Sequence, residues 1–413
     1  MKYNATPLLS KTTESFLPLI TPTPYQIKEL KEYRRIVREA VRNTFRTLNN
    51  AFEQDMHGKW QLSEKASQLP FAERLRQLNP AQKATLVHLK PKFNSQGSFV
   101  YKTLNLPCHK PPQQIDLDDG VYLPLDIFRD SPIVSKDLFF FIVDNTLIEL
   151  AEDMGWKFKP KNTCARLIVS DLIHIDIPLY AIPLERHTAM LASMDAKTIN
   201  NWLTDSRALL ARDDVYLAVR DSENWVVSDP ATISEWFKSN INMHGEILRN
   251  VCRHLKAWRD YRFPSGGPSS IALMACAVKS FNDITVERGI RFVQEQESEA
   301  LMLCANRLGQ QLIDSIPNPT DERKPQLYPQ SNMSDTEINQ HYLAAEALAE
   351  ELSFALKQAS NKQETVDSFR RALGERVPNR QDMIHVVTGV TADIMSKPAK
   401  TNPAPVVPNG DAG

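Results

Sequence analysis

The segment QQIDLDDGVYLP at residues 113–124 constrains the fold more than any other, because its side chains alternate with the period of a β-strand. Ile115 and Leu117 would point to one face of such a strand, and Asp116 and Asp118 to the other. Neighbouring carboxylates repel one another unless a cation lies between them. The acid pair is therefore expected to be a ligand set for hard divalent ions on the surface of a sheet.

The segment IHIDIPLYAIP at residues 173–183 alternates in the same way and adds a third acid. An isolated carboxylate in an apolar strand is costly unless it meets a metal ion or a partner, so Asp176 is expected to complete the ligand set. Three carboxylates on adjacent strands can hold two magnesium ions, one beside an attacking hydroxyl group and one beside a triphosphate. His174 shares the face of Asp176 but is expected to be structural, or to support a ligand, rather than to bind the metal itself, whereas Asp119 faces away from the acids.

The predicted metal site has an alternative interpretation, and two arrangements of the side chains would rule it out. The tripeptide DxD is common, so the acids could be structural only. If the three carboxylates were splayed apart or capped by basic side chains, the site would lose its function.

Two further segments carry residues suited to phosphate. Gly97 and Ser98 stand where a helix could begin and could offer a hydroxyl group and free amide hydrogens to an anion, although such a pair is often only a helix cap. One face of a predicted helix carries Arg249, Arg253 and Lys256. These side chains could hold a phosphate, or they could form a cationic stripe that is exposed to solvent. SGGPSS at 265–270 indicates a turn and a helix start.

The composition excludes several classes of protein. Forty-nine Lys and Arg against fifty Asp and Glu leave a net charge of -1, so no cationic field is available for a long nucleic acid. Apolar runs such as 138–143 are too short for a membrane span, and the first residues lack the pattern of a secretory signal, which favours a cytoplasmic protein. The five scattered cysteines are expected to be free thiols.

The pattern of the elements predicts an α+β fold with a mixed sheet backed by helices and a helical C-terminal lobe. We expect an N-terminal extension over 1–24, a catalytic lobe over 25–210 that starts with one long helix, a mainly helical lobe over 211–395, and a disordered tail over 396–413. Strands are predicted near residues 93–94, 113–119, 164–170, 173–182 and 215–220. Helices are predicted near residues 25–52, 136–154, 230–239, 244–262, 268–281, 286–315, 336–359 and 379–395.

Three motifs in a fixed order resemble a known family. The motifs that carry the resemblance are, in order, QGSFVYKTLN, DLDDGVYLP and HIDIPLYAIP. The chain resembles the bacterial cGAS/DncV-like nucleotidyltransferases (CD-NTases), within the polymerase-β-like nucleotidyltransferase superfamily. The resemblance is closest to the DncV type and covers roughly residues 25–395. It extends to NTCARL (162–167), WVVSDPATISEWF (225–237), LKAWRDYRF (255–263), SGGPSSIALMA (265–275) and PTDERKPQLYP (319–329).

The resemblance implies roles for single residues. The magnesium-binding acids would be Asp116, Asp118 and Asp176, with Asp176 also activating the attacking 3′-hydroxyl group. The donor nucleotide would be held by Gln96, Gly97, Ser98 and Tyr101, and its triphosphate by Lys256 and Ser270. The acceptor nucleotide would be contacted by Arg166, Ser228 and Asp321. Asp321 could accept hydrogen bonds from the N1 and N2 edge of guanine.

The same resemblance implies an activity and partners. The expected reaction joins ATP and GTP into 3′,3′-cyclic GMP-AMP, which would activate an effector in antiphage defence. The alternatives are a different cyclic product, a template-independent transferase with another acceptor, and a catalytically silent interaction protein. A ubiquitin-transfer-like (E1/E2-like) partner could attach Gly413 to other molecules, the alternative being an idle tail.

Overall fold

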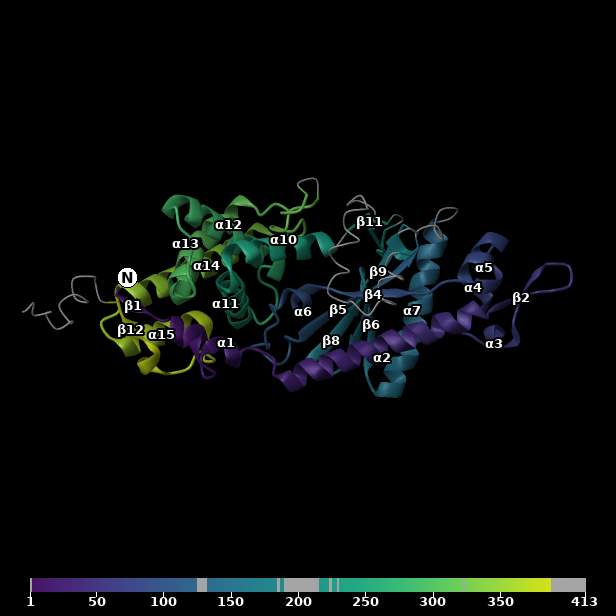
Figure 1. The fold of residues 1–413 in the computed structure, drawn as a ribbon, viewed down its shortest axis with the longest axis horizontal. Helices are drawn as coiled ribbons and strands as arrows, with labels where there is room; N and C mark the ends of the chain where they lie inside the picture. The colour runs from purple at the N-terminus through teal and green to yellow at the C-terminus, as the bar shows by residue number, and fades with distance from the viewer. Residues whose placement is uncertain are drawn as a thin grey trace, which may run out of the picture.

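The computed structural model has two lobes that lie side by side along the long axis of the molecule (Figure 1). It describes residues 2–124, 132–183, 186–188, 215–222, 225–228, 230–321 and 324–387. The sheet lobe holds the largest sheet and the helices between residues 24 and 154. The helical lobe holds residues 2–20 and the helices from residue 230 onwards. Expectations for residues 396–413, including Gly413, lie outside the described residues.

The sheet lobe is built on an eight-stranded mixed sheet in the order β11-β10-β9-β5-β8-β7-β6, with β4 paired to β5. The long strand β5 is central, because β8 and β9 run parallel to its first and second halves. The predicted mixed sheet is thus confirmed. Its strands are β4 (Lys92–Ser95), β5 (Ile115–Pro124), β6 (Lys157–Pro160), β7 (Ala165–Ile168), β8 (Ile173–Ile177), β9 (Leu179–Ile182), β10 (Tyr216–Leu217) and β11 (Val226–Val227).

Helices α2 (Pro24–Asn49) and α7 (Pro132–Met154) cover one face of this sheet. A capping box formed by Thr23 and Gln26 starts α2, with Pro24 in the first turn, where no amide hydrogen is needed. The apolar residues of β5 and β8 are buried against both helices, so the acids must face the other side. The smaller elements of the lobe are β2 (Phe52–Gln54), β3 (Trp60–Leu62), α3 (Glu64–Ser67), α4 (Ala72–Arg76), α5 (Pro80–Leu86) and α6 (Gly97–Tyr101).

The helical lobe packs around a second apolar core to which α11 and α12 contribute most of their length. Its helices are α10 (Pro230–His244), α11 (Glu246–Arg262), α12 (Ser270–Arg288), α13 (Glu297–Asp314), α14 (Asp335–Lys357) and α15 (Lys362–Leu373), with short 3₁₀ turns at Gln294–Gln296 and Gln381–Met383. No described helix combines the length and the apolar character that a membrane span requires. All five cysteines are free, as predicted.

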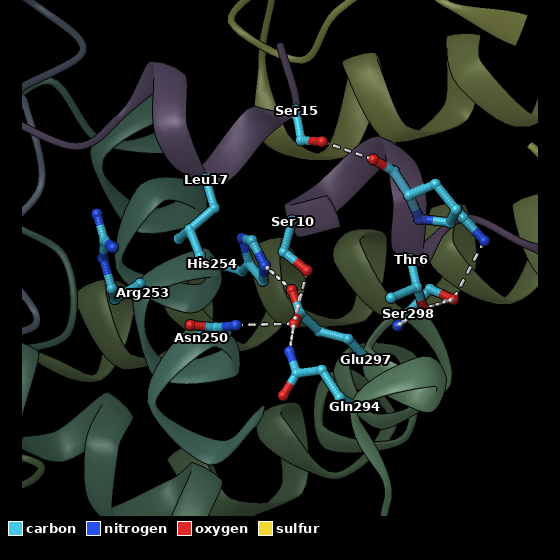
Figure 2. Close-up of polar contacts among 12 residues, drawn as sticks. Thr6, Ser10, Ser15, Leu17, Asn250, Arg253, His254, Gln294, Glu297 and Ser298 are labelled. Atoms are coloured by element: carbon cyan, nitrogen blue, oxygen red, sulfur yellow. Dashed lines mark hydrogen bonds and ion pairs between the residues drawn. The ribbon is translucent and has the colours of Figure 1, made fainter. Parts of the chain in front are cut away.

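Residues 2–20 belong to the helical lobe rather than to the sheet lobe that follows them (Figure 1). They form β1 (Tyr3–Asn4), a π-helical turn (Pro7–Lys11) and α1 (Phe16–Leu19), and β1 pairs with β12 (His385–Val386). Figure 2 shows the polar cluster that fixes this segment: buried Glu297 accepts hydrogen bonds from Ser10, Asn250, Gln294 and His254. Residues 3–4 and residues 385–386, far apart in the sequence, are therefore joined in the helical lobe.

The prediction of a helix over 379–395 is wrong for the described part of that range. Residues 381–383 form a 3₁₀ turn, and residues 385–386 form β12, because their backbone groups pair with β1. The apolar spacing in this range reflects burial of Met383 and Ile384 in the helical-lobe core. Helix α15 was not predicted.

Candidate active site

Four polar side chains form a compact patch on the open face of β5 and β8. The parallel register sets Asp116 opposite His174 and Asp118 opposite Asp176, so all four share one face. Ile115 and its alternating neighbours are buried on the opposite face. The alternation predicted from the sequence is confirmed, and it brings all three acids to one surface.

Asp119 faces away from this patch, as the alternation predicts. Its carboxylate is 1% exposed and accepts two hydrogen bonds from Arg38 of α2, at 2.6 and 2.5 Å. Ser95 donates a third hydrogen bond at 2.9 Å. This pair joins the long helix to the sheet beneath the site, because a buried carboxylate must be matched by a cation.

Arg166 caps the third acid. The antiparallel register of β7 and β8 sets Arg166 opposite Asp176, and its Nε and Nη2 atoms each donate to one carboxylate oxygen at 2.6 Å. The ligand atoms of Asp116, His174 and Asp176 nevertheless lie within 4.8 Å of one another. Of the two arrangements that would disable the site, the acids avoid the first because they converge. The second applies to one of them: Arg166 caps Asp176, which can bind a cation only after Arg166 releases at least one of its oxygens.

Asp116 and His174 leave two polar atoms without partners. His174 Nε2 lies 3.0 Å from Asp116 Oδ1, yet neither atom makes an aligned hydrogen bond with a described residue. Buried polar atoms without partners are rare unless water, an ion or a ligand completes them. This pair, with Asp118 and Asp176 beside it, fits a divalent cation.

Asp118 is a strongly perturbed acid. Burial, helped by the charges of Asp116 and Asp176, raises its pKa to about 8, although Arg166 and Lys256 act in the opposite direction. No described side chain donates a hydrogen bond to its carboxylate. A carboxylate in this setting needs a cation to remain ionised at neutral pH.

Gly97 is required by its contact with Asp118. The φ angle of Gly97 is +66°, and a Cβ atom on it would overlap the Asp118 Oδ2 atom. A residue without a side chain therefore allows the turn into α6 to approach the acid. Ser98, the next residue, lines a cavity that lies between the two lobes.

Gln96 and Tyr101 flank that turn. The Gln96 side chain lies between two tyrosines: it donates to the Tyr122 hydroxyl oxygen and accepts from the Tyr180 hydroxyl group, both at 3.0 Å. Tyr101 lines the cavity and packs edge-on against Phe237, and burial raises its pKa. Both polar groups of the Gln96 side chain are thus hydrogen-bonded to tyrosines of the sheet, whereas the Tyr101 ring lines the cavity.

The cationic face of α11 is buried, so the alternative of a solvated stripe is wrong. Lys256 Nζ donates to the carbonyl oxygen of Thr103 at 2.7 Å, and Arg253 donates to Asn105 Oδ1 at 2.9 Å. Burial lowers the pKa of Lys256 to about 8 and that of Arg253 to about 10. This helix holds the segment that follows α6, and thereby joins the two lobes.

A cavity of about 750 Å³ unites these residues between the lobes. The predicted residues on its wall are Gly97, Ser98, Tyr101, Asp116, Asp118, Ser228, Lys256 and Ser270. The side chains of Gln96, Arg166, Asp176 and Asp321 are not part of that wall, although Asp321 is adjacent in sequence to Thr320, which is. The carboxylates thus face Lys256 and Ser270 across one space.

Two cations on this wall, Arg259 and Lys324, were not predicted from the sequence. Arg259 lies one helical turn beyond Lys256 and donates to the carbonyl oxygen of Pro268 at 3.1 Å and to Ser270 Oγ at 3.4 Å. Lys324 lines the cavity from the loop before α14. The spacing of Arg259 from Lys256 was the signal that could have identified it.

Comparison with known proteins agrees with this geometry. Two family models match: the DncV-like nucleotidyltransferase domain of cyclic GMP-AMP synthase over residues 91–180, and the cyclic GMP-AMP synthase C-terminal domain over residues 245–386. A cyclic GMP-AMP synthase of Escherichia coli is 32% identical over 383 residues, covering 85% of this chain and 86% of the relative. The chain belongs to the DncV-like cyclic GMP-AMP synthase family.

Relatives in Vibrio cholerae extend this result. A cyclic GMP-AMP synthase from that organism is 33% identical over 309 residues, covering 71% of this chain and 69% of the relative. The solved structure of Vibrio cholerae DncV in complex with the linear intermediate 5′ pppA(3′,5′)pG superimposes with a TM-score of 0.79 at 28% identity. The match covers 94% of this chain and all of that one (100%). The chain is accordingly a nucleotidyltransferase of the cyclic GMP-AMP synthase type, and the predicted fold and enzyme class are confirmed.

Proposed function

We propose that this nucleotidyltransferase joins ATP and GTP into 3′,3′-cyclic GMP-AMP by two successive magnesium-dependent transfers. A solved DncV variant bound to ATP and GTP together, which superimposes with a TM-score of 0.80, supports this choice of substrates. The observation that carries the proposal is the cavity between the lobes, which has carboxylates on one wall and Lys256 and Ser270 on another. Such a space suits a triphosphate held between cations and metal-binding acids.

The three acids would hold the magnesium ions. Asp116 and Asp118 share a strand face, and Asp176 lies opposite Asp118 on the neighbouring strand. Magnesium bound there would neutralise charge on the triphosphate and favour deprotonation of the attacking 3′-hydroxyl group. Asp176 would accept that proton once Arg166 has moved from its carboxylate.

The remaining residues would align the two nucleotides. Ser98, Lys256 and Ser270 line the cavity and would donate hydrogen bonds to the donor triphosphate, with Gln96, Gly97 and Tyr101 around the donor nucleoside. Arg166, Ser228 and Asp321 would contact the acceptor, with Asp321 selecting guanine through its N1 and N2 donors. The linear product would then turn in the cavity so that its free 3′-hydroxyl group attacks the remaining triphosphate.

Product chromatography tests the proposal directly. The purified full chain is incubated with ATP, GTP or both, with and without Mg²⁺, and a phosphatase-resistant product is expected only when both nucleotides and the metal are present. Asp118→Asn should abolish this product because the site loses a ligand, whereas Asp153→Asn, at an exposed position of α7, should not. A product from ATP alone, or full turnover in Asp118→Asn, would contradict the proposal.

We infer a cellular role from the family resemblance. The cyclic nucleotide would be a second messenger of antiphage defence that activates an effector in the cytoplasm. An E1/E2-like partner would attach Gly413 to other molecules. Deletion of residues 396–413 should abolish conjugates in cells while leaving synthesis in vitro unchanged, and conjugates that persist in the shortened chain would refute the second inference.

A further inference from the structure

The imidazole ring of His174 is held in one orientation beside the acids. Gln114 Nε2 donates a hydrogen bond to the carbonyl oxygen of Ser170 at 2.8 Å, so its Oε1 atom must face the other way. That oxygen lies 3.1 Å from His174 Nδ1. Because an amide oxygen can only accept, Nδ1 carries a proton, so Nε2 is the ring nitrogen that can offer a lone pair to a ligand.

Nε2 lies close to, but is not aligned with, an atom that also accepts hydrogen bonds. His174 is 8% exposed and lines the cavity, and its Nε2 lies 3.0 Å from Asp116 Oδ1. Neither atom has an aligned hydrogen-bond partner among the described residues. Two such atoms repel at this separation unless a positive charge satisfies both.

The separation of these two atoms suits one shared metal ion. Neighbouring ligands of an octahedral ion at about 2.1 Å are about 3.0 Å apart, because their bonds meet at a right angle. The distance between His174 Nε2 and Asp116 Oδ1 is 3.0 Å. One ligand atom from each of Asp116, His174 and Asp176 lies within 4.8 Å of the others, so Asp176 can belong to the same site once Arg166 releases one of its oxygens.

We propose that His174 is a metal ligand through Nε2, beside Asp116, and that the site therefore binds Mn²⁺ in preference to Mg²⁺. The inference rests on the metal site of the proposed function and adds a nitrogen to its carboxylate ligands. Imidazole suits transition metals, whereas Mg²⁺ is bound through oxygen. Gln114 is then a positioning residue, because histidine ligands commonly donate their second ring N–H to a fixed oxygen atom.

Pulsed electron paramagnetic resonance of bound Mn²⁺ tests this assignment. Mn²⁺ alone, without nucleotide, is added to the full chain, and electron spin-echo modulation from a directly bound imidazole nitrogen is expected. The pattern should change to that of ¹⁵N when the chain is made with ¹⁵N-labelled histidine, and it should vanish in His174→Gln. His244→Gln is the matched control, since His244 is also buried with an unpaired ring nitrogen but contacts the Asn282 amide.

Metal titration gives a second readout that separates the two metals. His174→Gln should raise the Kd for Mn²⁺ at least about 10-fold and the Kd for Mg²⁺, measured by competition, by less than about 3-fold. Equal weakening of both metals would overturn the proposal. So would Mn²⁺ that binds without nitrogen coupling, a result that leaves the carboxylate site of the proposed function intact.

Two further outcomes are decided by the same measurements. A chain that binds no Mn²⁺ at all would refute both this inference and the metal site on which it rests. If circular dichroism shows that His174→Gln does not fold, isotope labelling of the unaltered chain decides the question alone.

Discussion

Replacement of Gly97 by alanine should separate the stability of the chain from its catalysis. Alanine at a φ angle of +66° adopts the left-handed conformation, which costs about 1–2 kcal/mol of unfolding free energy. Its Cβ atom would also overlap the Asp118 Oδ2 atom, the free end of a side chain that can rotate away. The folded chain should therefore survive with the Asp118 carboxylate displaced.

Gly155 offers the matched control for this experiment. Its φ angle is +67°, and a Cβ atom on it would meet nothing within 4 Å. Gly155→Ala should therefore lose a similar 1–2 kcal/mol, about the cost of the left-handed conformation alone, without affecting the acids. The two variants differ only in what the new methyl group contacts.

The expected difference lies in turnover. A displacement of about 1 Å at a catalytic group can lower the rate about 100-fold, so Gly97→Ala should lose at least that much of kcat while Gly155→Ala stays near the unaltered chain. Pyrophosphate release with ATP and GTP gives the rate, and urea unfolding gives the free energy. Near-normal turnover in Gly97→Ala would show that the approach of the turn to Asp118 does not matter for the reaction.

Three other substitutions test the cations around the site. Lys256→Met should raise the free energy of unfolding at pH 7 by about 3 kcal/mol, because the pKa of the buried lysine falls from 10.5 to about 8. The folded pKa lies below the unfolded one, so this penalty is complete below pH 8 and disappears as the pH rises towards 10.5; thermal unfolding across that range should show the advantage of the variant shrinking. Arg38→Met should lower the free energy of unfolding in urea by about 3 kcal/mol, because it leaves Asp119 buried without its partner. Arg166→Gln should tighten Mn²⁺ binding about 10-fold, or about 1.4 kcal/mol, in a titration without nucleotide, because both oxygens of Asp176 are released.

Each of these substitutions has an outcome that would contradict it. An advantage of Lys256→Met that stays constant with pH would mean that the lysine charge is not the cause. Arg35→Met is the control for Arg38→Met, since Arg35 pairs with Glu32 on the exposed face of the same helix and should lose less than about 1 kcal/mol. Equal losses of unfolding free energy in Arg35→Met and Arg38→Met would refute the role given to the Arg38–Asp119 pair. Unchanged Mn²⁺ affinity in Arg166→Gln would refute the role given to the Arg166–Asp176 pair.

Local patterns in the sequence were enough to predict the strands that carry the acids. Alternation over 113–124 and 173–183 reflects burial on one face, a property that neighbours in sequence report directly. The same rule placed Asp119 on the opposite face. Helical spacing likewise predicted α2, α7 and α11 with small errors at their ends.

Contacts between distant segments could not be predicted in this way. The pairing of β1 with β12 joins residues 3–4 to residues 385–386, and it replaced the expected helix with a strand. The Arg166 cap on Asp176 depends on the antiparallel register of two strands, which no local pattern specifies. The orientation of His174 required the Gln114 amide to be in place, so the sequence suggested only a structural role.

The position of the first residues has a consequence for synthesis on the ribosome. Residues 2–16 emerge before the rest of the described chain, but their partners are Glu297, Ser298, Leu356 and the strand at residues 385–386. The sheet lobe can therefore form before residues 297–386, which contact the amino-terminal segment, have been synthesised. Release of a prematurely terminated product would leave apolar side chains such as Phe16 uncovered, marking that product for degradation before it could encounter nucleotide.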